Sequence, residues 1–425
     1  MTTEQEQALQ LATEAGHILL ENGAEISRVE ETMTRIASAY GVEDESFFVL
    51  SNGIIATGQH YARAEFIPIK GTQLSRVVEV NQLSRDVCDG RCSLDQLSSR
   101  LDAIRHSTAK PWWEQIVGIA VGVSAFSLLF GGSLMDAAIT FAVGVLLGCF
   151  MTFLMPHMSR FFGNVVGGLV GGMLCIVASR LGLGEHLPNM IIGTIIALVP
   201  GVPFTNGIRD IAHEDYIAGA TRMLDAFMMF LCIALGVCLA FIIDGRLHHG
   251  LLQLGAPAVD YYAAGWVFQL PAALLGTIGF SVLFGAPRRF YVGCGICGMA
   301  GWALFLLLNG DMRVALFHLS PAESALFAAM LVALLSQLMA QKWHCPTTLY
   351  LICGIIPLVP GGAIFWTAYY MVASRLGMVA ATGFVAIKVT IAIAVGIILA
   401  GGIVRIATSL NKMRISNKVK GKTKN

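Results

Sequence analysis

The first 110 residues alternate between amphipathic stretches and short apolar runs, none long enough to cross a bilayer. Two stretches have apolar residues at helical spacing and stop at Gly23 and Gly41, as helices commonly do. The runs ESFFVLSNGIIATGQ and ARAEFIPIK are rich in β-branched and aromatic residues and predict strands. Helical spacing returns at roughly 74–88 and 94–106. The pattern predicts a compact α+β domain over residues 1–110.

The pattern changes at Lys110-Pro111, where long apolar segments begin. Trp112 and Trp113 are aromatic residues of the kind that anchor at a membrane interface. About ten stretches of the length that crosses the hydrocarbon core fit into the rest of the chain. We place these spans at 114–130, 134–155, 161–180, 187–203, 217–243, 261–284, 290–308, 322–341, 346–366 and 377–404. The predicted fold class is an all-α polytopic membrane protein with a soluble α+β domain at its N-terminus.

A short motif occurs twice within these spans. Residues 195–201 read IIALVPG and residues 355–361 read IIPLVPG, near the ends of the fourth and ninth predicted spans. With about five spans in each half, the two copies point in opposite directions across the membrane. Inverted repeats that Pro and Gly interrupt at matching places are typical of secondary transporters, whose substrate site lies near the midplane. We therefore divide the membrane part into two inverted five-helix repeats, 111–250 and 251–405.

Each Pro-Gly pair predicts a broken helix. Pro200 has no N–H and its ring clashes with the carbonyl of Ile196, so this carbonyl lacks its helical partner, and Gly201 lets the chain turn. The second break repeats the arrangement with Ile356, Pro360 and Gly361. An unsatisfied carbonyl in lipid costs several kcal/mol, so the break has to face protein or a watery cavity. The freed carbonyls can accept from an ammonium group or bind a cation.

The chain resumes after the first break as PFTNGIRD, which brings polar groups next to the turn. Pro203 suits a first helical turn, and the exposed N–H groups there favour a carboxylate, so the broken helix offers both poles of a zwitterion. Thr205 and Asn206 are placed to bind a third polar group, and Asp210 follows Asn206 by one helical turn. The alternative is a structural kink that neighbouring helices fill.

Ionisable residues inside predicted spans are candidates for function, because charges in a membrane are costly. Asp225 lies in the fifth span with Arg222 one turn before it, and Lys388 lies near the middle of the tenth. One interpretation is an Arg222–Asp225 pair that neutralises itself, with Lys388 lining water. The other makes Asp225 a proton or substrate carrier and Lys388 its counter-charge. Asp210 is a further candidate for proton coupling.

Composition and charge agree with a membrane protein. Hydrophobic residues make up 56% of the chain, charged residues 13%, and the mean hydropathy is +0.69. Residues 1–110 hold 16 acidic against 10 basic side chains, whereas the tail at 406–425 is basic and has no acid. A basic tail is typical of the cytoplasmic side, and the acidic N-terminus does not resemble a secretory signal. We expect a multi-pass protein with both termini in the cytoplasm, in contact with lipid and not with nucleic acid.

The sequence gives little support for a metal site or for a bound cofactor. Most of the 10 cysteines fall in apolar segments, where Cys behaves as a small hydrophobe. Cys294 and Cys297 have CxxC spacing but no second pair of ligands. We predict no metal site and no cofactor. Asp136, which follows a Gly-Gly pair, is predicted to cap a helix N-terminus rather than to carry a proton.

Several motifs together resemble the threonine/serine exporter (ThrE) family. ENGAEISRVEETM, SNGIIATG, GGSLMDAAITF and LVPGVPFTNGIRD look like the family's first conserved region; GFSVLFGAPRRF, GCGICGMAGW and CPTTLYLICGIIPLVPGG look like its second. The resemblance covers nearly the whole chain and fuses two regions that some relatives carry on separate polypeptides. The family pattern falls on Pro200, Gly201, Pro203, Asn206, Asp210, Gly219 and Arg222, and on Pro357, Pro360 and Gly361. Asp225 and Lys388 rest on the burial argument alone.

The resemblance implies a transporter, not an enzyme. It would export small hydrophilic amino acids such as threonine and serine across the bacterial cytoplasmic (inner) membrane, driven by the proton motive force as in proton antiport. An alternative is export of a dicarboxylate such as succinate, held by Arg209, Arg222 and Lys388. A third is a membrane-tethered enzyme or sensor domain with His17, Glu25, Ser51 and Asn52 as polar candidates, though no catalytic constellation stands at a readable spacing. The sequence is also compatible with a homo-oligomer.

Overall fold

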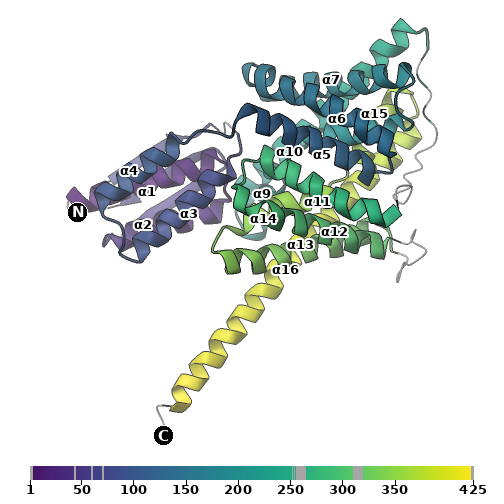
Figure 1. The fold of residues 1–425 in the computed structure, drawn as a ribbon. Helices are drawn as coiled ribbons and strands as arrows, with labels where there is room; N and C mark the ends of the chain where they lie inside the picture. The colour runs from purple at the N-terminus through teal and green to yellow at the C-terminus, as the bar shows by residue number, and fades with distance from the viewer. Residues whose placement is uncertain are drawn as a thin grey trace.

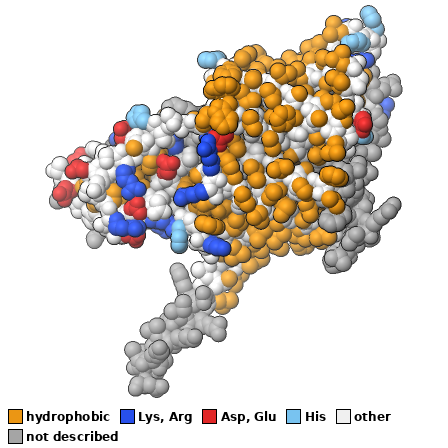
Figure 2. Space-filling view, viewed as in Figure 1, with side chains coloured by type: hydrophobic (Ala, Val, Ile, Leu, Met, Phe, Trp, Pro, Cys, Tyr) orange, Lys and Arg blue, Asp and Glu red, His pale blue; other side chains and the backbone are white. Residues whose placement is uncertain are grey.

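The structure is a computed structural model that describes residues 3–42, 45–58, 61–68, 71–250, 252, 254, 265–309 and 319–422. It is mostly helical and has two parts (Figure 1). The smaller part carries the N-terminus and lies at one end of a larger bundle of helices. Figure 2 shows a bundle surface covered with hydrophobic side chains, whereas charged side chains of both signs are scattered over the smaller part. The bundle therefore presents the surface of a membrane protein.

The N-terminal part packs helices against a small antiparallel sheet. Its elements are α1 (Thr3–Glu21), α2 (Ile26–Ala39), β1 (Ser46–Leu50), β2 (Gly53–Gly58), β3 (Tyr61–Phe66), α3 (Leu74–Cys88) and α4 (Leu94–Arg105). The strand order is β1-β2-β3, with Phe48 opposite Ile55 and Ile55 opposite Ala64. One hydrophobic cluster joins these helices to the sheet. The predicted helices and strands are therefore present, and independent folding of residues 1–110 stays a prediction.

The bundle begins at Trp112, the first of the two residues predicted to lie at the membrane interface. Its helices are α5 (Trp112–Leu129), α6 (Leu134–Cys149), α7 (Arg160–Arg180), α8 (Leu187–Ile195), α9 (Gly201–Ala212), α10 (Tyr216–Leu247), α11 (Gly265–Leu283), α12 (Tyr291–Leu308), α13 (Pro321–Trp343), α14 (Thr347–Ile355), α15 (Gly361–Val372) and α16 (Leu376–Lys422). Among the described residues, 7 helices are long and apolar enough to cross a membrane, or up to 9 if each bent pair is one span. The apolar part of α11, Val267–Leu283, is shorter. The count of about ten spans thus stays a prediction.

The same helix contacts recur in the two halves of the bundle. In the first half α5 packs on α6, α7 on α10, and α9 on α10; in the second, α11 packs on α12, α13 on α16, and α15 on α16. Contacts between the halves are also reciprocal, because α8 touches α15 while α14 touches α9. The first helices of the two halves, α5 and α11, pack on each other. This is the contact pattern that an internal repeat produces.

The two breaks have the same local geometry. In each, a 3-10 turn follows a helix, one extended Val comes next, and the next helix begins after Pro200 or Pro360. The Gly201 N–H donates to the Val199 carbonyl at 2.8 Å, and the Gly361 N–H donates to the Val359 carbonyl at 2.7 Å. The bend is 63° at the first break and 46° at the second. The repeated LVPG sequence therefore encodes the same turn twice.

The carbonyl groups at the two breaks have hydrogen-bond partners that the sequence does not reveal. The Ile196 carbonyl accepts from the Val199 N–H at 3.2 Å, and the Ile356 carbonyl accepts from the Val359 N–H at 3.1 Å. Each carbonyl lacks its usual helical donor, as expected, because Pro200 and Pro360 have no N–H. The expectation that the carbonyls are left unpaired is wrong, because the chain tightens into a 3-10 turn before each proline. The Ala197 carbonyl also loses its helical donor, since the Gly201 N–H donates to the Val199 carbonyl.

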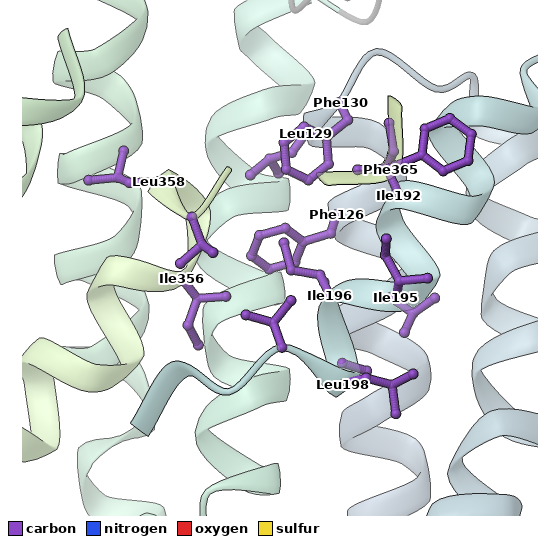
Figure 3. Packing of buried hydrophobic residues seen from close by; sticks show 14 of the residues in the cluster. Phe126, Leu129, Phe130, Ile192, Ile195, Ile196, Leu198, Ile356, Leu358 and Phe365 are labelled. Atoms are coloured by element: carbon purple, nitrogen blue, oxygen red, sulfur yellow. The ribbon is translucent and has the colours of Figure 1, made fainter. Parts of the chain in front are cut away.

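The breaks meet in the middle of the bundle. Figure 3 shows Ile196 and Leu198 from the first break, and Ile356 and Leu358 from the second, in one apolar cluster. The approach is close, because a Cβ atom built on Gly361 would lie 3.6 Å from the Ile196 Cδ1 atom. The cluster also contains Phe126 of α5 (Figure 3). Apolar packing therefore fills the centre, and polar groups of the first break lie to one side of it.

Candidate functional site

A cavity of about 220 Å³ lies beside the first break, where the N-terminal part meets the bundle. Six of the residues singled out in the sequence line it: Pro200, Gly201, Pro203, Asn206, Arg222 and Asp225. Gly23 and Thr72 of the N-terminal part line the cavity, and so does Phe284, which directly follows α11. The structure thus brings most of the first-break candidates to one cavity, and the N-terminal part forms one wall of it.

Asn206 is a buried polar residue of this cavity. Its side chain is 1% exposed, and its Nδ2 atom donates to the Gly23 carbonyl at 2.7 Å. Its Oδ1 atom has no hydrogen-bond partner among the described residues. Such an unsatisfied buried acceptor costs free energy unless water or a ligand donates to it. The neighbouring Thr205 is fully buried, but it is not among the lining residues.

Arg222 and Asp210 hold the turn between α1 and α2. The Arg222 guanidinium donates to Asp210 Oδ2 at 2.5 Å and to the Ala24 carbonyl at 2.9 Å. The other Asp210 oxygen accepts from the Ile26 N–H at 3.0 Å. The interpretation that pairs Arg222 with Asp225 is therefore wrong, because Asp210 and a backbone carbonyl occupy the guanidinium. Asp210 does not line the cavity with Asn206 as their spacing suggests, although both side chains contact the turn between α1 and α2.

Further contacts fasten the N-terminal part to both halves of the bundle. Arg209 pairs with Glu25 at 2.7 Å. The N–H groups of Leu74 and Ser75 donate to the carbonyls of Phe284 and Gly285, each at 3.0 Å. Gly23 has φ +85°, a conformation that favours glycine, and this lets the α1–α2 turn reach α9. The polar motif after the first break therefore has a docking role that the sequence does not reveal.

Asp225 has a different partner and a different environment. It pairs with Arg160 at 3.6 Å, and the side chains are 33% and 45% exposed for Asp225 and Arg160 respectively. Both line the cavity. Asp225 is thus the cavity carboxylate that remains accessible, whereas Asp210 is 1% exposed and fully engaged in docking.

A second cavity, of about 330 Å³, lies beside the second break. Pro357 and Pro360 line it, together with aromatic side chains that include Trp302 and Trp366. Gly361 does not line it and contacts the first break instead. The two cavities share no lining residue. The second break therefore has a cavity of its own, but an apolar one.

Lys388 lies apart from both cavities. It is exposed on α16, and its ammonium group lies 5.1 Å from the centre of the Phe384 ring. It lines neither cavity, and the carboxylate it was expected to balance pairs with Arg160. The geometry gives no support to an Asp225–Lys388 pair.

Two carboxyl groups outside the helical spans, those of Glu30 and Asp215, have raised pKa values. Burial raises the pKa of Glu30 above its usual value; the hydrogen bond from the Val49 N–H lowers it in part, and the Asp215 and Asp210 carboxylates raise it further. Burial also raises the pKa of Asp215, and His213 partly offsets this. The Asp215 and Asp210 carboxylates act on Glu30 from the bundle, so this share of the rise in its pKa depends on docking.

Asp136 does not cap α6 as predicted. Ser133 is the N-cap, and Asp136 completes the capping box by accepting from the Ser133 N–H at 2.8 Å. It also accepts from His186 Nδ1 at 2.9 Å. Asp136, Glu185 and His186 could together reach a metal ion, but these bonds already satisfy the buried carboxylate. Cys294 and Cys297 are buried and reduced, in line with a packing role.

The polar candidates of the N-terminal part are spread over separate contacts. His17 bonds to Glu65 at 3.0 Å, and Glu25 pairs with Arg209. Ser51 and Asn52 form the turn between β1 and β2. The described residues therefore show no arrangement of these four side chains as a catalytic centre.

Comparison with known families decides which protein class this is. The family model for threonine/serine exporters (ThrE) matches residues 10–243, and a second threonine/serine exporter model (ThrE_2) matches residues 269–403. The chain belongs to the threonine/serine exporter family. Its many apolar helices make it a multi-pass membrane protein of that family.

Relatives of this chain include proteins named as exporters and proteins named as succinate transporter subunits. A "Threonine/serine exporter" of Corynebacterium glutamicum is 25% identical over 85% of this chain and 75% of its own length. A "Probable threonine/serine exporter" of Mycobacterium tuberculosis is 23% identical over 84% of this chain and 68% of its own. A "Probable succinate transporter subunit YjjP" of Escherichia coli is 25% identical over 58% of this chain and 98% of its own. No solved structure gives a significant match.

The sequence did not point to Arg160 or to Gly23 as parts of the exporter's cavity. Arg160 stands before the third predicted span, where a basic residue usually reports on orientation. Gly23 follows the end of α1, as the sequence predicts, and its carbonyl contacts Asn206 across 183 positions. The one available signal was that ENGAEI belongs to the family's first conserved region, together with the first break.

Proposed function

We propose that this chain exports small hydrophilic amino acids, threonine and serine, from the cytoplasm through the cavity at the first break. The observation that carries the proposal is the buried Asn206 Oδ1 acceptor in a cavity that also holds the accessible Asp225 and Arg160 side chains. The cavity volume, about 220 Å³, suits a ligand of this size. The names of the full-length relatives support the same substrate class.

The cavity offers complementary groups to a zwitterion. The substrate ammonium would donate to Asn206 Oδ1 and lie near the Asp225 carboxylate. Its carboxylate would meet Arg160. The N-terminus of α9 contributes less than expected, because the Phe204 N–H donates to the Pro200 carbonyl and Pro203 has no N–H. Ligand charges would thus be met by side chains more than by the helix end.

Alternating access would use the two breaks in turn. The repeated helix contacts and the matched turns at Pro200 and Pro360 support two inverted halves. The cavity at the first break opens beside the N-terminal part, which we place in the cytoplasm with both termini; the cavity at the second break would serve the external side. Asp225 would carry the coupling proton of an antiport driven by the proton motive force, since it is the accessible carboxylate of the cavity.

Entry from the cytoplasm would require the N-terminal part to move. Its Gly23 carbonyl occupies the amide nitrogen of Asn206, and its α1–α2 turn occupies Asp210 and Arg222. These contacts place the N-terminal part over the cavity as a cover. Release of the α1–α2 turn would widen the access and free donors on α9.

A dicarboxylate such as succinate is the second candidate. Both Arg160 and Arg222 line the cavity; Arg160 could bind one carboxylate, and Arg222 could bind the other once it releases Asp210 and the Ala24 carbonyl. The name of the YjjP relatives supports this substrate class, although they match only part of this chain. Lys388, which the sequence suggests as a further cation for a dicarboxylate, is exposed and does not line this cavity.

Transport by purified protein distinguishes these candidates. The full-length chain is reconstituted into proteoliposomes, and labelled threonine, serine and succinate are compared side by side, with and without an imposed pH gradient. We expect threonine and serine to move and the gradient to accelerate them. Movement of succinate alone would replace the amino-acid proposal by the dicarboxylate one.

A further inference from the structure

A third cavity, of about 340 Å³, lies between α9, α13, α14 and α16, away from both breaks. One end is basic, with Arg209, His213 and Arg405. The opposite wall is apolar, with Leu351, Ile397 and Ile398. Among the described residues, no acidic side chain lines it. The cavity therefore combines an anion-attracting end with a hydrocarbon-like wall.

The basic end keeps donors free. Arg209 pairs with Glu25 through Nη1, but a guanidinium carries five N–H donors in total. His213 bonds to the Arg209 carbonyl through Nδ1 at 2.8 Å, so its Nε2 atom can donate to an anion only when both ring nitrogens carry a proton. Arg405 is exposed and has no acidic partner among the described residues.

The cavity is open on the side of α16. Gly401 and Gly402 line it, and a Cβ atom built on either would meet no atom within 4 Å. Ile398, one turn away, is 40% exposed on the apolar surface of the bundle. Arg405 is the first basic residue of the charged end of α16. The basic end therefore lies where the apolar surface stops, and the apolar wall continues along the surface that faces lipid.

We propose that this cavity binds the phosphate of an anionic phospholipid, with an acyl chain lying along Ile397 and Ile398. A phosphate accepts hydrogen bonds from guanidinium groups, and basic side chains at a membrane interface attract anionic headgroups. A free phosphate has no apolar part that could pack against the apolar wall. A lipid satisfies both ends of the cavity, and this site does not depend on which substrate is transported.

The experiment measures lipid retention by the full-length protein in detergent. Native mass spectrometry compares dioleoyl phosphatidylglycerol, dioleoyl phosphatidylcholine and glycerol 3-phosphate as the soluble headgroup. Arg405→Gln removes one cation, and Gly401→Leu fills the open side without a charge change. Arg375→Gln and Gly377→Leu are matched controls at the other end of α16, where the arginine is exposed and the glycine has open space around it.

We expect retention of phosphatidylglycerol over phosphatidylcholine. Arg405→Gln should reduce it by about fivefold, the factor that one basic side chain near an anionic surface supplies. Gly401→Leu should reduce it as well, while both controls retain the parent's value. Equal retention of the two lipids, equal losses in Arg405→Gln and Arg375→Gln, or equally strong binding of glycerol 3-phosphate would each overturn the proposal.

Discussion

Arg222 and Asp210 form a buried ion pair of 2.5 Å, with side chains 4% and 1% exposed. The same two side chains bind the backbone of the α1–α2 turn through the Ala24 carbonyl and the Ile26 N–H. The pair therefore ties the membrane bundle to the N-terminal part. It also separates two roles that the sequence merges, because Asp210 docks the N-terminal part and Asp225 faces the cavity.

Arg222→Gln should loosen the docking. It leaves Asp210 buried without its counter-charge, and removal of one partner of a buried pair costs about 3–5 kcal/mol. Limited proteolysis of the purified protein should cut faster between α4 and α5. The double variant Arg222→Gln/Asp210→Asn should recover part of the protection, and Arg246→Gln, at the exposed end of the same helix, should change nothing. Equal protection in Arg222→Gln and the parent would contradict the docking role.

Asn206→Ala should weaken threonine binding without unfolding the bundle. A lost hydrogen bond costs ~0.5–1.5 kcal/mol, or up to ~3 kcal/mol with a charged partner. Isothermal titration of the purified protein with threonine measures the change. Asn189→Ala is the control, since Asn189 is a buried asparagine of α8 outside the cavity. Unchanged affinity in Asn206→Ala would remove Asn206 from the site.

Asp225→Asn should abolish acceleration by a pH gradient. The change keeps the shape of the side chain but removes the proton acceptor in the cavity. Asp210→Asn should instead loosen docking and retain the response to the gradient. Both variants are compared with the parent in one proteoliposome assay. If Asp225→Asn responds to the gradient as the parent does, Asp225 does not carry the coupling proton.

Docking of the N-terminal part should strengthen as the pH falls. The Asp215 and Asp210 carboxylates of the bundle raise the pKa of Glu30 only when the two parts are docked, so the docked state binds more protons. The stabilisation is complete below the ordinary carboxyl pKa and is lost as the pH rises through the raised value. Protection from proteolysis, measured across this range, should show the trend, and Glu30→Gln should flatten it. Protection that increases with pH would reverse the sign of the argument.

Much of the fold follows from local pattern. The helices at 74–88 and 94–106, the strands and the positions of the long apolar helices depend on periodicity and turn residues near in sequence. The two breaks were predictable for the same reason, because Pro200 and Pro360 act on their own turns. The local geometry of the breaks could not be predicted, because the sequence does not show that the chain forms a 3-10 turn before each proline. In the first break this turn lets the Val199 N–H donate to the Ile196 carbonyl.

The partners of the charged residues could not be predicted from spacing. Arg222 lies one turn from Asp225, yet it reaches Asp210 on another helix and Ala24 on another part of the protein. Asp225 pairs with Arg160, which is 65 positions away on α7. These contacts depend on how α7, α9 and α10 pack, and helical periodicity carries no information about that packing.

Labelled-threonine transport by Gly201→Leu tests most directly whether the cavity at the first break is the substrate site. Gly201 begins α9 and lines the cavity, and a Cβ atom there would meet only Phe284, at 3.6 Å, so a larger side chain fills the cavity without a backbone clash. Gly377→Leu on exposed α16 is the control. The account predicts a folded Gly201→Leu protein that no longer moves threonine, beside an active Gly377→Leu protein. Transport at the parent's rate by Gly201→Leu would contradict it.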